Sequence, residues 1–138
     1  GPQQAGARQP VQAPRADVSA RADGLAAFRE LLPGLLPDGI DTFADGSFAE
    51  ELGNMALDHV FATVWNRPGL GRRERSLVTL GVLIALRASE ELKLHLRIAE
   101  NNGLTRDELA EVVYHSAFYA GFPAAVAARA AGLEAFAD

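Results

Sequence analysis

The sequence contains no cysteine at any of its 138 positions. A chain without thiol groups can form no disulfide, can supply no thiolate ligand to a metal and can run no dithiol redox cycle. These absences exclude the chemistry of thiol peroxidases and disulfide reductases. If the chain is an enzyme, we expect it to work by polar acid and base chemistry.

Positive charge is also scarce, because 13 lysine and arginine residues face 18 aspartate and glutamate residues, for a formal net charge of -5 at pH 7. Such a chain meets repulsion before it can neutralise phosphates, so nucleic acid is not an expected partner. The longest apolar run, residues 77–86, contains Thr79 and is about half as long as a bilayer span must be. We therefore expect a cytoplasmic protein with no membrane partner.

Residues 1–17 lack the apolar periodicity of a folded segment. They begin with Gly1-Pro2-Gln3-Gln4, which is typical of a scar left by tag cleavage, and continue as a stretch rich in Gln, Ala, Pro and Arg. We expect a disordered leader over residues 1–17. The remaining length suits one domain, so we expect a single domain over residues 18–138.

Beyond the leader, the sequence predicts helices and no sheet, because no segment shows sustained period-two alternation. Possible capping boxes at Ser47–Glu50 and Thr105–Glu108 predict two helix starts. Ser89 is expected to cap another helix. In full, the expected helices run from Val18 to Leu32, over 48–65, over 72–86, from Ser89 to Gly103, from Thr105 to Gly121 and from Pro123 to Phe136. The expected fold class is all-α, a compact bundle of about six helices.

The same periodicity predicts which residues each helix buries. The third expected helix, over 72–86, is apolar nearly all round and should therefore be central. For the others, the expected inward residues are Leu52, Met55, Ala56, Val60 and Val64 on the second helix, Leu92, His95, Leu96 and Ala99 on the fourth, and Leu109, Val112, Val113, Ser116 and Ala117 on the fifth.

Glu91 and His95 lie four residues apart on one expected helix, so the carboxylate can orient or charge the imidazole. His95 adjoins apolar positions and should face inward, where burial shifts pKa values. The pair is a plausible acid and base. A solvated helix pair or a hydrogen-bonded core histidine would give the same spacing.

His115 and Tyr119 form a second pair at this spacing and could face the same cavity, although Tyr119 could equally be a core aromatic residue. His59 lies between Leu57 and Val60, and we interpret it as structural. Two histidines four apart on one helix, as in a zinc motif, are missing. We therefore expect no metal.

Arg72, Arg73 and Arg75 crowd the start of an expected helix, where the helix dipole disfavours cations. A nearby anion should compensate this charge. It could be a substrate carboxylate, held bidentately, or acidic residues at the surface or on a neighbouring subunit.

Residues 48–130 resemble the carboxymuconolactone decarboxylase family. The resemblance rests on the order of FAEELGNMALDHVFATVW, VWNRPGLGRRERSLVTLGVLIAL and EELKLHLRIAENNGLTRDELAEVVYHSAFYAGFPAA. It implies an alkyl hydroperoxidase D-like, all-α fold whose subunits form an obligate oligomer, a trimer or hexamer, with the active site near a subunit interface. In the redox branch of this family, cysteines occupy the positions of Ala88 and Glu91 and a glutamate that of Ser76, so the resemblance implies no peroxidase activity here.

The decarboxylase branch implies a lyase that needs no cofactor and acts on γ-carboxymuconolactone or a similar small substrate. In this branch His95, oriented by Glu91, would donate a proton or hydrogen bond to the developing enolate. Arg72 would grip a carboxylate, and Trp65 would supply an apolar wall. The other residues expected in the pocket are Arg75, which would bind substrate, and His115 and Tyr119, which would complete the site.

Two departures from the family pattern leave the reaction open. The position of His115 is often glutamine in the decarboxylase branch, and the tyrosine matching Tyr119 is there followed by Cys-Gly, whereas this chain has Ala120 and Gly121. One alternative is therefore a repurposed member that catalyses an isomerisation or cyclisation in a specialised biosynthetic pathway, since these reactions also stabilise an enolate. A second alternative is a binding module without catalysis.

Overall fold

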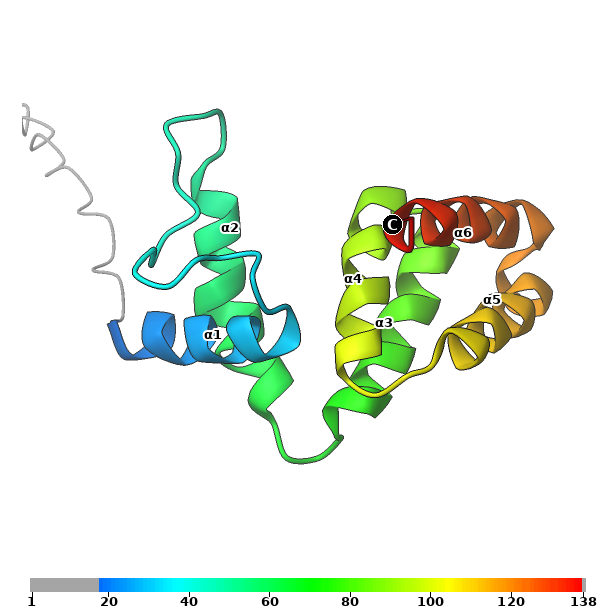
Figure 1. Ribbon diagram of the computed structural model, residues 1–138, viewed down its shortest axis with the longest axis horizontal. Helices are drawn as coiled ribbons and strands as arrows, with labels where there is room; N and C mark the ends of the chain where they lie inside the picture. Colours follow the sequence, from blue (N-terminus) through cyan, green and yellow to red (C-terminus); the bar gives the residue numbers. More distant parts are fainter. Residues whose placement is uncertain (1–17, 138) are drawn as a thin grey trace, which may run out of the picture.

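The computed structural model describes residues 18–137, which are helical throughout apart from turns and loops (Figure 1). The expected all-α class is therefore confirmed, and the expected leader over residues 1–17 lies outside the described residues. The elements are α1 (Val18–Leu31), α2 (Glu51–Met55), the π-helix η1 (Ala56–Phe61), the 3₁₀ turn η2 (Val64–Asn66), α3 (Arg72–Leu86), α4 (Ser89–Asn101), α5 (Arg106–Ala120) and α6 (Phe122–Ala135).

The elements form two packing units, which we call the N-terminal lobe (residues 18–66) and the C-terminal bundle (residues 72–137). Figure 1 shows them side by side, joined by the turn over residues 67–71, and the principal helix contacts lie within each unit. The lobe meets the bundle where Leu31, Leu32 and Trp65 pack with Ile98 of α4. The expectation of one domain over residues 18–138 stays a prediction.

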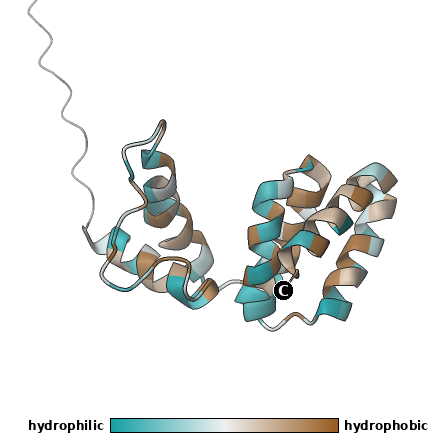
Figure 2. Ribbon diagram, turned by 45° about the horizontal axis from the view of Figure 1, so that its top comes forward, coloured by the Kyte–Doolittle hydropathy of each residue, from teal (hydrophilic) through white to brown (hydrophobic). Residues whose placement is uncertain are grey.

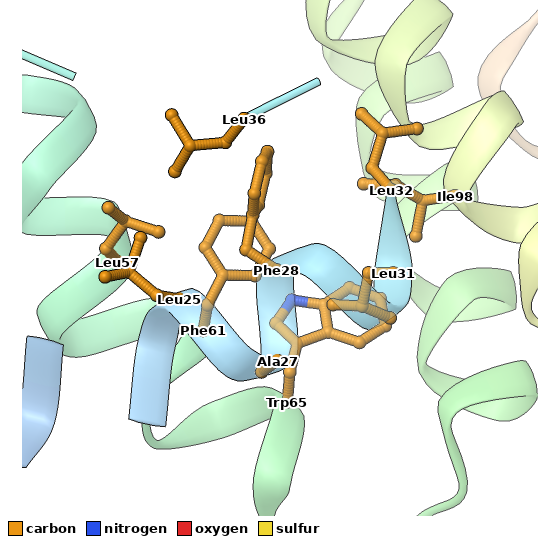
Figure 3. Close-up of a cluster of buried hydrophobic side chains, with 10 residues drawn as sticks. All are labelled: Leu25, Ala27, Phe28, Leu31, Leu32, Leu36, Leu57, Phe61, Trp65 and Ile98. Carbon is orange, nitrogen blue, oxygen red and sulfur yellow. The ribbon is translucent and has the colours of Figure 1, made fainter. Parts of the chain in front are cut away.

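The N-terminal lobe is held together by large side chains that α1 and the π-helix bury against each other. Phe28 of α1 meets Phe61 edge to face, with ring centroids 5.0 Å apart, and Leu57 is fully buried beside them (Figure 3). Gly24 lets the two backbones approach, because a Cβ there would lie 2.0 Å from the carbonyl oxygen of Leu57. A paired Arg21 and Asp58 close the edge of this contact.

The capping box expected at Ser47 and Glu50 is wrong. The Ser47 hydroxyl bonds instead to Asp45, while Glu50 accepts a hydrogen bond from the backbone N–H of Gly46. Helical structure consequently starts at Glu51 and changes to a π-helix at Ala56. Local side-chain bonds in the preceding loop compete with the cap, as short polar side chains often do.

The inward face expected for the second helix is also wrong. Leu52, Met55, Val60 and Val64 are exposed and Ala56 is only partly buried, whereas Leu57, Phe61 and Trp65 are buried. This segment is apolar on two sides, and the side with the two rings fits against α1. The other side remains an exposed apolar surface on the single chain.

The C-terminal bundle follows the sequence more closely. The capping box of Thr105 and Glu108 is present, and Gly103 and Gly121 adopt the positive φ angles expected at helix ends. Ser89, by contrast, is the first helical residue and does not cap, because Ala88 occupies the cap position. Small residues bring α6 close to α4, since the buried residues of α6 are Ala124, Ala125, Ala128 and Ala131.

Helix α3 has the expected bounds but is not central in the single chain. Leu80 and Ile84 are buried in the bundle, while Val78, Val82 and Leu86 are exposed. The expectation overlooked that four helices are too few to surround one of them. Figure 2 accordingly shows hydrophobic colour on outer helix surfaces as well as inside. Over residues 18–137, no helix is both long and apolar enough to span a membrane.

Candidate functional site

Trp65 forms the wall at which the two packing units meet. It lies in η2, is only 5% exposed, and stacks on His95 of α4 with ring centroids 6.1 Å apart and planes 21° from parallel. Figure 3 shows its indole beside Leu31 in the core of the N-terminal lobe. The lobe thus supplies an aromatic wall, and the bundle supplies the histidine that rests against it.

The surroundings of His95 favour the neutral form of its imidazole. Burial lowers the pKa of His95, and the negative charge of Glu91 opposes this effect only in part. The Nδ1 atom of His95 is buried, and no group in residues 18–137 forms a hydrogen bond with it. Glu91 is exposed and acts on the imidazole through its charge, so the orienting role expected for Glu91 stays a prediction.

A small pocket of about 140 Å³ is lined in part by Trp65. Its volume is close to that of a cavity that holds a benzene molecule, about 150 Å³. Most of its walls are apolar, and its polar residues are Arg75 and Thr79 of α3. The complete lining is Val64, Trp65, Leu70, Arg75, Val78 and Thr79.

Arg75 contributes to this pocket an N–H donor that has no acceptor in residues 18–137. One terminal nitrogen, Nη2, donates to the carbonyl oxygen of Arg67 at 3.1 Å, whereas the buried Nε–H has no acceptor in the described part of the chain. In residues 18–137, the only buried side-chain nitrogen or oxygen atoms without a hydrogen-bond partner are Nε of Arg75 and Nδ1 of His95. Both residues adjoin Trp65, and buried polar groups are rarely left unpaired without a reason.

The other two arginines of the cluster already have carboxylate partners within the chain. Arg72 pairs with Glu30 at 2.5 Å and donates to the Asn66 side chain at 3.0 Å. Arg73 pairs with Glu108. The anions expected beside this cluster therefore include acidic residues at the surface of the same chain. The role expected for Arg72 in binding a substrate carboxylate stays a prediction.

His115 and Tyr119 lie elsewhere on the single chain. Their rings stack at 5.0 Å, and both side chains are exposed on α5. His115 lines a separate groove of about 570 Å³ between α3 and α5, together with Arg73 and Glu108. His95 lines neither this groove nor the small pocket beside Trp65, so neither of these two pockets brings the two imidazoles together.

His59 is exposed on the π-helix and does not line the small pocket beside Trp65. Across residues 18–137, no group of three or more His, Asp and Glu side chains is placed to hold a metal ion.

Sequence reasoning missed four residues of the small pocket, Val64, Leu70, Val78 and Thr79. One signal was visible, because Thr79 interrupts the longest apolar run. Its hydroxyl donates to the backbone oxygen of Arg75 at 2.9 Å, one turn earlier. Leu70 and Val78 carry no polar signal, and only the packing of the turn against α3 brings them to the pocket.

Comparison with known proteins gives a consistent picture. Residues 50–134, more than half of the chain, match the model of the carboxymuconolactone decarboxylase family. The chain is 46% identical over 91 residues to 4-carboxymuconolactone decarboxylase of Acinetobacter baylyi, an alignment that covers 66% of this chain and 68% of that protein. It is 52% identical over 74 residues to nitrosuccinic acid decarboxylase of Metarhizium robertsii, covering 54% of this chain and 52% of that protein. An uncharacterized 15.0 kDa protein of Paracoccus denitrificans is 33% identical over 70 residues, which cover 49% of this chain and 52% of that protein.

Proposed function

The chain belongs to the carboxymuconolactone decarboxylase family, and from this premise we propose that it is a lyase that releases carbon dioxide from a small carboxylated substrate. Two relatives named as decarboxylases support the reaction class. The observation that carries the proposal is the pair of unpartnered buried atoms beside Trp65, Nδ1 of His95 and Nε of Arg75. An imidazole and a guanidinium beside an apolar wall suit an anionic substrate that must be held and then protonated.

The reaction requires from the protein mainly the electrostatic stabilisation of a developing negative charge. When the bond to the leaving carboxylate breaks, its electron pair moves through the conjugated lactone onto the carbonyl oxygen and forms an enolate. A hydrogen-bond donor held at that oxygen stabilises the charge as it develops. The neutral imidazole of His95 has one N–H for this purpose and one bare nitrogen through which it can relay a solvent proton to the product. No step calls for a cofactor.

We also propose that the pocket is completed by a second copy of the chain within a trimer or hexamer. Val64, Leu70 and Val78 line the pocket, yet each is about half exposed on the single chain. The exposed residues of α3 and of the second helical segment extend this apolar surface. His115 and Tyr119 would then reach a substrate from a neighbouring copy. Sedimentation of the protein at micromolar concentration tests this point, and a monomer would contradict it.

The direct test of the proposed function is release of carbon dioxide from 4-carboxymuconolactone. The wild-type chain should release it, and the substitution His95→Gln should lower turnover by about a hundredfold or more, because an acid or base in the site contributes rate factors of this size. Circular dichroism should show an unchanged helix content. His59→Gln is the matched control, since His59 is exposed and does not line the small pocket beside Trp65, and it should leave turnover unchanged.

The outcomes of this test separate two errors. If the wild-type chain is active and His95→Gln is equally active, His95 plays no part in the mechanism. If the wild-type chain releases no carbon dioxide, the substrate is wrong, and an isomerisation or cyclisation through a similar enolate becomes the better candidate. The Metarhizium relative is named as a decarboxylase of nitrosuccinic acid, so decarboxylation of a different acid should be tested beside these reactions.

A further inference from the structure

We propose that Arg75, and not Arg72, binds the substrate, and that it holds an acidic group that the substrate retains and not the carboxylate that leaves. This inference rests on the proposed function and adds to it which acidic group of the substrate is held by the protein. The three arginines near the beginning of α3 differ sharply in what they already bind.

Arg75 is the arginine of this cluster without a carboxylate partner in the described part of the chain. The guanidinium groups of Arg72 and Arg73 are each paired with a glutamate. Arg75 has only the carbonyl oxygen of Arg67, and its Nε–H is buried without an acceptor. A buried N–H donor without an acceptor is costly, so an anion that accepts a hydrogen bond from it is favoured.

The pocket around Arg75 suits one planar acidic group with a few carbon atoms attached. Its volume of about 140 Å³ is small, and Trp65, Leu70 and Val78 make its walls mainly apolar. A charge-assisted hydrogen bond gains strength where water is excluded. Trp65 both lines this pocket and stacks on His95, so the indole is the residue that the Arg75 pocket and the imidazole share.

The charge balance of the reaction decides which acidic group Arg75 holds. A carboxylate that leaves as carbon dioxide loses its negative charge in the transition state. A cation paired with that group would bind the substrate more strongly than the transition state and would slow the reaction. A retained carboxylate keeps its charge throughout, so Arg75 can bind it without opposing catalysis.

Binding can be measured without turnover, because Trp65 is the only tryptophan of the chain and lines the pocket. The probe is succinate, a small dicarboxylate, compared with its neutral analogue succinamide. Succinate should change the Trp65 fluorescence saturably, and succinamide should not. Arg75→Lys should weaken succinate binding about tenfold or more, since lysine keeps the charge but loses the planar donors. Arg73→Lys is the matched control and should bind succinate like the wild type.

A second variant keeps the test decisive if Arg75→Lys does not fold. Val78→Phe adds bulk from an exposed wall of the pocket and leaves Arg75 in place. It should weaken succinate binding as well, while thermal unfolding remains that of the wild type. Unchanged binding in Val78→Phe, or a loss of binding in Arg72→Lys with none in Arg75→Lys, would overturn the assignment.

Kinetics with 4-carboxymuconolactone test the second half of the inference. Arg75→Lys should raise KM about tenfold and leave kcat nearly unchanged, the pattern of an interaction made equally in the ground and transition states. A fall in kcat at constant KM would place Arg75 at the reacting carbons and contradict a retained group. If the wild type does not turn over this lactone, the proposed substrate fails while succinate binding still tests Arg75. If turnover depends on His95 but Arg75→Lys binds succinate as tightly as the wild type, only this inference fails.

Discussion

The N-terminal lobe and the C-terminal bundle fill their cores with side chains of different size. The lobe fills its core with rings, Phe28, Phe61 and Trp65, between segments of irregular helix. The bundle brings regular helices together through small side chains, such as Ala124 and Ala128 of α6. Large aromatic side chains fill much of the first core, and alanines of α6 pack against leucines in the second.

This difference matches what each unit contributes to the candidate site. The bundle supplies the polar groups, His95 and Arg75, from regular helices, which fix side-chain positions well. The lobe supplies the apolar wall, Trp65, from a short 3₁₀ turn whose position depends on the packing beneath it. A change in the lobe core should therefore disturb the site through Trp65, while the polar groups stay in place.

The largest expected effect contrasts loss and gain of volume in the two cores. Leu57→Ala leaves a hole in the lobe and should lower the free energy of unfolding by about 2–5 kcal/mol. Ala128→Leu forces extra atoms between α6 and its neighbours and should cost about 1–3 kcal/mol. Urea unfolding measures both. Leu52→Ala, at an exposed position, is the control, and a Leu57→Ala chain as stable as this control would contradict the role given to volume.

An intermediate effect separates two helical glycines. At Gly24 an added Cβ would clash with the Leu57 backbone, whereas at Gly132 its nearest neighbour would lie 3.8 Å away, an ordinary contact. Gly24→Ala should destabilise the chain by about 1–3 kcal/mol. Gly132→Ala should be neutral or stabilise it by up to about 1 kcal/mol, because alanine favours helix. The unfolding temperature should fall in Gly24→Ala and stay the same or rise in Gly132→Ala, and equal shifts would contradict the close approach of α1 and the π-helix.

The smallest expected effect is a shift in the pKa of His95, which stacks on Trp65 where the two packing units meet. Burial lowers the pKa of His95 and the charge of Glu91 raises it, so Glu91→Gln should lower this pKa further. The acidic limb of kcat/KM, where the base form of His95 is lost, should then move to lower pH. Glu90→Gln is the control on the same helix, because Glu90 pairs with Lys93. A shift of the limb to higher pH in Glu91→Gln would contradict this account.

The sequence predicted features that depend on neighbours along the chain. The ends of α1 and α3 and the Thr105 cap follow from residues within one turn, and each signal there had no strong competitor. The second helix could not be predicted in the same way. It is apolar on two sides, and the choice between Leu57 and Leu52 is made by α1, which lies more than 20 residues earlier.

The candidate site shows the same limit. Trp65, His95 and Arg75 could be named from the sequence, because residue type and family pattern mark them. Their arrangement around one wall could not, since it depends on where the lobe meets α4. Likewise, the partner of Arg72 is Glu30, 42 positions away, and no local pattern points to that pairing.

The π-helix of residues 56–61 has a consequence for the Trp65 wall. Its wider turn, closed by a bond from the N–H of Ala62 to the carbonyl oxygen of Leu57, holds one residue more than an α-helical turn would. If the same residues formed an α-helix instead, with none removed, all that follows would turn by about 100° around the axis. The indole would then point away from α4. The one additional residue in the π-helical turn thus sets the rotation that places Trp65 against His95.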